Sequence, residues 1–182
     1  MKDLARPVSA DELLLLPRDG MRSELVRGEV RKMPPPGAEH GSTTSNIHYF
    51  LEDFVRPKYL GRIFAAETGF LIERDPDTVR APDCAFVSRD RMPHPIPRKY
   101  LPFAPDLAVE TLSPDDRPPA VKEKVEQWLQ CGSRAVWVID PVRREVTVYR
   151  TGRAPRVLGE GDTLDGEEIL PGFSILVARI FQ

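Results

Sequence analysis

The chain has 182 residues, of which 41% are hydrophobic and 30% are charged, with a formal net charge of −2 at pH 7. This length suits one domain, which we place over residues 1–182, and the composition excludes extended disorder. The charge excludes a surface that is basic throughout, so any nucleic-acid contact must come from local patches. We expect a cytoplasmic protein without a membrane segment, because no apolar run approaches the ~20 residues of a spanning helix.

The first third of the chain predicts a short helix, a hairpin and a long helix. Ser9 and Glu12 have the spacing of a capping box ahead of four leucines. Residues 23–33 alternate apolar and polar side chains around a glycine, which predicts a β-hairpin with Glu24 at its entrance.

A helix is expected over residues 39–59, where apolar side chains recur at helical spacing after three consecutive prolines. His40 falls at its start. A histidine there is more often a cap or a surface residue, and the alternative, which makes His40 a candidate substrate-binding residue, is that it lines a site.

Two later strands each open with a Pro-Asp pair and carry the most informative acids. Glu110 lies in the middle of the apolar run 103–114, and a buried carboxylate needs a cation or an open cleft. Asp106 is roughly 13 Å away along the extended chain, too far to share one ion. Asp83 opens the strand 84–87, and a neighbouring strand would lie only about 4.8 Å away. The sequence therefore predicts that Asp83 and Glu110 face one site.

A divalent metal ion is the cation that we expect between these acids. Two carboxylates about 4 Å apart repel by roughly 4 kcal/mol at an effective dielectric of 20, and Mg²⁺ or Mn²⁺ reverses the sign. The alternative is that the acids form ion pairs with arginines, for instance Arg80, in a purely structural role.

Residues 88–102 form a predicted surface loop with four prolines and five basic residues. Basic loops beside a metal cleft are natural phosphate contacts, which makes Arg89, Arg91, Arg98 and Lys99 candidate substrate-binding residues. An ordinary solvated loop is an equally good interpretation.

The last third predicts a helix over 120–130, a hairpin from strands 135–139 and 145–150, and short strands over 152–182. Together the elements predict an α/β fold. Its mixed central sheet should have the strands of Asp83 and Glu110 in the middle and the helices 39–59 and 120–130 at its flanks.

The order of these motifs resembles the Uma-two family, within the PD-(D/E)xK nuclease superfamily of restriction-endonuclease-like fold, from about residue 10 to residue 180. The residues that carry the resemblance are Glu24 to Glu29, His40, Ala81-Pro82-Asp83, Pro105 to Pro114, Lys124 with Trp128 and Gly132, and Val136 to Pro141. One position departs from the superfamily pattern, because Leu112 stands where a lysine is expected. The helical Lys124 takes its place in the resemblance, four residues before Trp128, whereas periodicity alone does not choose between Lys122 and Lys124.

The resemblance implies a metal-dependent endonuclease that hydrolyses phosphodiester bonds, with DNA as the expected substrate. Asp83, Glu110 and the main-chain carbonyl of Thr111 would hold Mg²⁺ or Mn²⁺. Lys124 would orient or deprotonate the attacking water, and Glu24 would take a second metal or orient the first ligands. The sequence leaves the oligomeric state open between a monomer and a homodimer, in which nucleases that cut both strands often pair two sites. The alternative function is a nucleic-acid-binding or interaction module that has kept the fold without catalysis.

Overall fold

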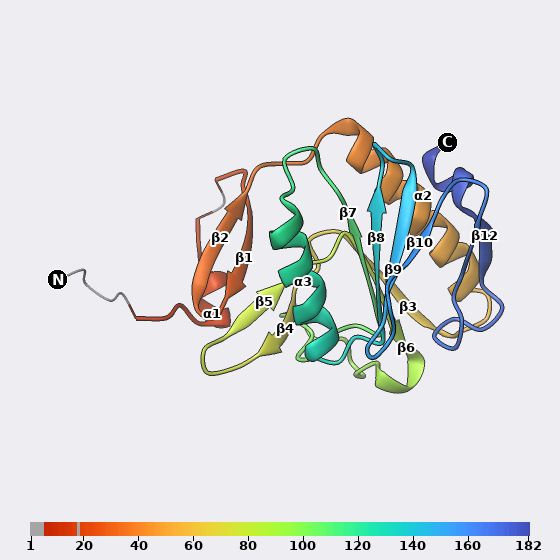
Figure 1. Cartoon of the computed structure of the whole chain (residues 1–182). Coiled ribbons are helices and arrows are strands. Elements are labelled where there is room, and N and C mark those ends of the chain that lie inside the picture. The colour runs from red at the N-terminus through yellow and green to blue at the C-terminus, as the bar shows by residue number, and fades with distance from the viewer. Residues whose placement is uncertain (1–5, 18) are drawn as a thin grey trace.

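The computed structural model describes residues 6–17 and 19–182 (Figure 1). In these residues the strands form a six-stranded sheet, a four-stranded sheet and a two-stranded hairpin. The helices are α1 (Ala10–Leu13), α2 (Ala38–Val55) and α3 (Pro118–Gln130), with 3₁₀ turns η1 (Arg89–Arg91) and η2 (Val177–Phe181). The strands are β1 (Arg22–Val26), β2 (Glu29–Met33), β3 (Gly61–Ala65), β4 (Phe70–Glu73), β5 (Thr78–Arg80), β6 (Cys84–Ser88), β7 (Leu107–Thr111), β8 (Ala135–Asp140), β9 (Glu145–Tyr149), β10 (Arg156–Leu158), β11 (Thr163–Asp165) and β12 (Ser174–Leu176).

The six-stranded sheet has the order β10-β9-β8-β7-β6-β3 and is mixed. Its β7–β8 pair is parallel and its other pairs are antiparallel. Strands β6 and β7 are direct neighbours, with Cys84 opposite Val109. The predicted α/β fold with a mixed central sheet is therefore confirmed, and so is the predicted neighbourhood of these two strands.

Alternation along each strand divides the sheet into two apolar faces, because successive side chains point to opposite sides. Phe86 and Val109 belong to the face that packs against α2, and Ala85 and Ala108 to the face that packs against α3. Figure 1 shows the two helices on opposite sides of the sheet. Residue 110 follows the same alternation as residue 108, so the side chain of Glu110 points toward α3.

Helix α2 differs from its predicted bounds at both ends, starting one residue early at Ala38, and helix α3 differs at its start. Helix α2 stops at Val55, four residues early, because Pro57 has no N–H to continue the hydrogen-bond ladder. Helix α3 starts two residues early at Pro118 and Pro119. Proline is tolerated in the first turn, where the N–H groups have no partner within the helix.

The four-stranded sheet, in the order β2-β1-β5-β4, carries the predicted hairpin. Its apolar side packs against α1, whose capping box from Ser9 to Glu12 is present as predicted. The turn between β1 and β2 uses Gly28 at φ 79°, a left-handed conformation that glycine adopts without strain. Through this sheet, the side chain of Glu24 reaches the end of the larger sheet.

The C-terminal segment covers the α2 side of the large sheet. Side chains from β11, β12 and η2 join the core there, and the Asn46 amide of α2 donates to the carbonyl oxygens of Ile180 and Gln182 at 3.0 and 2.7 Å. None of the helices in residues 6–17 and 19–182 combines the length and the apolar character that crossing a membrane requires.

Candidate functional site

The candidate site lies at the end of the large sheet where β6 begins and β7 ends. Because these strands are antiparallel, the residue before β6 lies beside the last residues of β7, and the Asp83 N–H donates to the Val109 carbonyl at 3.0 Å. Alternation then points the carboxylates of Asp83 and Glu110 to the same face. Both acids are buried, with 3% and 7% of their surface exposed. The structure therefore brings together the two acids that the sequence paired.

Helix α3 brings a lysine and a tryptophan to Glu110. The Lys124 ammonium lies 2.8 Å from Glu110 Oε2, and the Trp128 indole N–H donates to Glu110 Oε1 at 2.7 Å. The two side chains are one helical turn apart, so they leave the same face of α3. Lys122, by contrast, is exposed and pairs with Glu126 along the helix at 3.7 Å. Of the two candidate lysines, Lys124 is the one that reaches the acids.

Glu24 supplies a third buried carboxylate, from β1. Its Oε1 atom accepts a hydrogen bond from the Ala81 N–H at 2.9 Å and lies 3.3 Å from the Lys124 ammonium. Its Oε2 atom pairs with Arg80 at 2.8 Å, and both side chains are at most 5% exposed. The alternative in which the acids have a purely structural role expected Arg80 to pair with Asp83 or Glu110. Instead, Arg80 pairs with Glu24.

Asp83 is held by three donors from different elements. Its Oδ2 atom accepts from the Thr111 N–H at 2.9 Å and from His40 Nε2 at 3.2 Å, and its Oδ1 atom lies 3.4 Å from the Arg22 guanidinium. His40 is 7% exposed and belongs to the third position of α2. The structure therefore places His40 and Thr111 against Asp83.

Two residues of this group were missed by sequence reasoning, although signals for both exist. Arg22 lies two residues before Glu24 on β1, and the period of a strand puts both on one face. Trp128 was assigned only to the core and to the resemblance, yet a buried indole N–H needs an acceptor. Its place one turn after Lys124 pointed to the same acid.

Charge and burial shift the pKa values of the three acids in different directions. Burial opposes ionisation of Glu24, but the charges of Lys124 and Arg80 outweigh it and lower the pKa. The pKa of Asp83 is also lowered, because the His40 hydrogen bond and the Lys124 charge overcome its burial. Burial raises the pKa of Glu110 to about 7, with the neighbouring Asp83 and Glu24 charges adding to it against Lys124. Desolvation opposes protonation of the partly buried Lys124, yet three carboxylates raise its pKa, so the ammonium stays protonated.

The raised pKa of Glu110 makes stability depend on pH in the metal-free protein. Its folded pKa of about 7 lies above its ordinary value of 4.5, so between these values the folded state holds a proton that the unfolded state has lost. Stability should therefore fall as pH rises through this window, on the order of 2 kcal/mol for this group. Asp83 acts in the other direction only at lower pH, because its pKa is lowered from 3.8.

We expect Glu110→Gln to remove that contribution. Urea denaturation in EDTA at pH 5 and pH 7.5 should show a smaller decrease in unfolding free energy for the variant than for the wild type. An identical decrease in both proteins would contradict the raised pKa.

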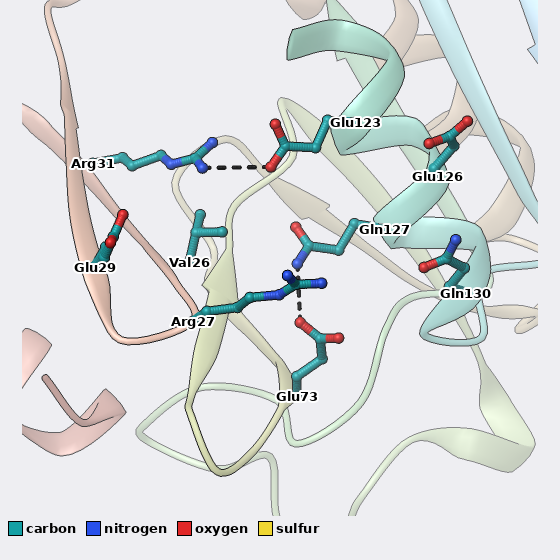
Figure 2. A pocket seen from close by; sticks show the side chains of 9 residues that line it. All are labelled: Val26, Arg27, Glu29, Arg31, Glu73, Glu123, Glu126, Gln127 and Gln130. Atoms are coloured by element: carbon teal, nitrogen blue, oxygen red, sulfur yellow. Dashed lines mark hydrogen bonds and ion pairs between the residues drawn. The ribbon is translucent and has the colours of Figure 1, made fainter. Parts of the chain in front are cut away.

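A polar pocket of about 530 Å³ lies between the β1–β2 hairpin, β4 and α3 (Figure 2). Its residue Gln127 accepts from Arg80 Nε at 2.7 Å, which links the pocket to the partner of Glu24, and donates to Glu73 at 3.0 Å. The charged residues lining the pocket are Arg27, Arg31, Glu29, Glu73, Glu123 and Glu126. With four carboxylates against two guanidinium groups, the lining of this pocket has a net negative charge.

The basic loop lies away from the acids. Strand β6 leads from Asp83 to Ser88, which puts the start of the loop roughly 16 Å along the strand from Asp83. In this loop Arg91 pairs with Asp106 at 3.1 Å and Lys99 with Asp11 at 2.8 Å, while Arg89 and Arg98 are exposed. The structure does not bring these four basic residues together with Asp83 and Glu110.

The donor set fits a hard divalent cation in chemical terms. Asp83 and Glu110 are carboxylates on neighbouring strands beside the main chain of Thr111, and Mg²⁺ is commonly held by one or two carboxylates together with waters. Within the described residues, no three His, Cys, Asp or Glu side chains are arranged as metal ligands. The arrangement that fits is therefore the two-carboxylate one, in which the Lys124 ammonium now supplies the positive charge at Glu110.

Comparison with known proteins adds a family and a fold. The family model described as "Uma2: Putative restriction endonuclease" matches residues 10–178. Among solved structures, the chain is similar to a protein from Anabaena variabilis described as "a putative nuclease belonging to DUF820". The TM-score is 0.84 at 24% sequence identity, over 96% of this chain and 98% of that chain, and this likeness shows a shared fold. No curated protein matches the sequence.

Proposed function

Because the chain belongs to the Uma2 family, described as putative restriction endonucleases, we propose that it is a metal-dependent nuclease that hydrolyses phosphodiester bonds of DNA. The observation that carries this proposal is the contact of one lysine ammonium with two buried acids. Lys124 reaches Glu110 at 2.8 Å and Glu24 at 3.3 Å, next to Asp83. Phosphodiester hydrolysis needs acidic and basic groups in one site, because the nucleophile must be held and the negative charge on the phosphate must be stabilised.

Asp83, Glu110 and the Thr111 carbonyl would hold Mg²⁺ or Mn²⁺. When bound, the ion would polarise the phosphate oxygens as a Lewis acid and favour a nucleophilic water. Lys124 has a raised pKa and keeps its proton at Nζ, which favours orienting the water and facing the phosphate over deprotonating the water. Trp128 holds Glu110 at Oε1, which leaves Oε2 directed at Lys124.

His40 and Glu24 each position another residue of the site. The buried His40 contacts Asp83 Oδ2, so we assign it the role of orienting Asp83, where the sequence had predicted substrate contact. Glu24 is fixed by Arg80 and the Ala81 N–H, and it contacts the same Lys124 ammonium that contacts Glu110. We propose that Glu24 positions the lysine.

The proposal is tested by a divalent-metal titration on plasmid DNA and on single-stranded DNA and RNA oligonucleotides. We expect cleavage with Mg²⁺ or Mn²⁺ and none in EDTA. Lys124→Ala should lose at least about 100-fold of the rate, by analogy with the removal of one transition-state donor. Lys122→Ala, on the exposed side of the same helix, should keep it.

Each other outcome of this titration has a definite meaning. Binding of DNA without cleavage by the wild type would favour the non-catalytic module. Equal rates in both lysine variants would overturn the assignment of Lys124. Double-strand breaks in place of nicks would indicate that two copies act together.

A further inference from the structure

Each buried carboxylate of the site has a cationic partner from the same chain. Glu24 pairs with Arg80, Glu110 with Lys124, and Asp83 with Arg22. Buried carboxylates need such partners, because an uncompensated charge in the interior is costly. The metal-free protein is thus balanced by its own side chains.

The oxygen atoms of the two predicted ligands fall into two classes. Glu110 Oε1 and Asp83 Oδ2 accept hydrogen bonds from Trp128, from His40 and from the Thr111 main chain. These donors belong to the packed framework and have little freedom to move. Glu110 Oε2 and Asp83 Oδ1 instead face long cationic side chains.

The three cationic partners differ in freedom. Arg80 is 5% exposed and is fixed a second time by Gln127, so it stays with Glu24. Lys124 and Arg22 are 18% and 15% exposed. Both side chains are therefore partly open to solvent, and long flexible stems of this kind allow the charged end to move from a carboxylate toward water.

We infer that Lys124 and Arg22 are internal counter-cations that occupy Glu110 Oε2 and Asp83 Oδ1 until a divalent ion displaces them, after which both face the phosphate of the substrate. This rests on the proposed function, because it concerns the ion and the substrate of the same site. An ammonium and a divalent ion that contact the same carboxylate repel each other, because both are cations. Even about 6 Å apart and at the dielectric of water, their repulsion corresponds to about a tenfold change in affinity. Arg22 thereby becomes a phosphate-binding residue.

The first measurement is the affinity for Mn²⁺ alone, by isothermal titration calorimetry. We expect Lys124→Gln and Arg22→Gln each to bind Mn²⁺ at least about tenfold more tightly than the wild type. The matched controls are Lys122→Gln on the same helix and Arg31→Gln on the same hairpin, which should not change the affinity. Lys124→Arg keeps the charge and should keep the wild-type value. Thermal melting verifies that each variant folds.

The second measurement is the binding of a DNA oligonucleotide with Ca²⁺ in place of Mg²⁺. Arg22→Gln should weaken this binding in Ca²⁺, and lower the salt dependence by about one phosphate contact, but have no effect in EDTA. An effect of equal size in EDTA would contradict the displacement of Arg22 by the ion.

The outcomes separate this inference from the proposed function. Unchanged or weaker Mn²⁺ binding by Lys124→Gln, in a protein that cleaves DNA with Mg²⁺, would overturn the counter-cation role alone. Mn²⁺ binding by the variants but not by the wild type would support it and contradict a metal-dependent wild-type activity. No Mn²⁺ binding by any of these proteins would overturn both.

Discussion

Replacing Glu24 by alanine should lower the free energy of unfolding by about 3 to 5 kcal/mol, the usual cost of breaking a buried ion pair by removing one partner. The change leaves the guanidinium of Arg80, only 5% exposed, without its charged partner. It also removes the acceptor of the Ala81 N–H and one of the two carboxylates that contact Lys124. Urea denaturation in EDTA measures the effect.

Arg31→Ala is the matched control for this experiment. Arg31 also comes from the hairpin, but its pair with Glu123 is 3.4 Å long and both side chains are about half exposed. Such surface pairs contribute at most about 1 kcal/mol. If Glu24→Ala lowered the free energy of unfolding by less than that value, the buried Glu24–Arg80 pair would not contribute the stability expected of it. Glu24→Gln should give an intermediate value, because the amide keeps an acceptor oxygen for one of the donors.

Asp83→Asn should reduce metal-dependent cleavage by at least about 100-fold, because the amide lacks the charge that the ion and Arg22 need. It should also remove the stabilisation by Mn²⁺, which is about 2.7 kcal/mol for the wild type at 100 times the dissociation constant. The cleavage assay and a thermal melt with and without Mn²⁺ measure the two effects separately.

Asp106→Asn is the control for Asp83→Asn, since both acids follow a proline and both are buried. Asp106 accepts from the Ser88 N–H at 2.8 Å and pairs with Arg91 at the other end of the strands. Its variant should lose stability but keep cleavage per folded molecule and keep the Mn²⁺ response. The assignment of Asp83 would be wrong if both variants lost cleavage equally.

The absence of a lysine at position 112 has a structural explanation. Alternation puts position 112 on the same side of the sheet as Glu110, and Leu112 is partly buried there in the core beneath α3. The cation comes from the helix above, because α3 crosses this end of the sheet with Lys124 and Trp128 over Glu110. A site that keeps its acids on strands can therefore take its lysine from a helix.

The sequence predicted the structure best where a local residue pattern is typical of one element. Apolar runs that open with a Pro-Asp pair identified the strands of Asp83 and Glu110, and the capping box and the alternation around a glycine identified α1 and the hairpin. The helix bounds were less accurate at proline, because the same residue that stops α2 is accepted in the first turn of α3. The resemblance to the Uma-two family was confirmed by the match over residues 10–178. The assignment of site residues stays a prediction.

By itself, the sequence predicted the strands of Asp83 and Glu110, the β1–β2 hairpin and the three helices, and that Glu110 needs a partner from outside its own strand. Only the tertiary structure decided the direction of β6, which takes the basic loop of Arg89 away from Asp83. It also decided that Arg80 pairs with Glu24 and Arg22 with Asp83. The physical reason is the range of the forces. Backbone sterics and side-chain alternation act over a few residues, whereas these ion pairs join segments 56 and 61 residues apart, whose positions are set by the packing of two sheets and a helix.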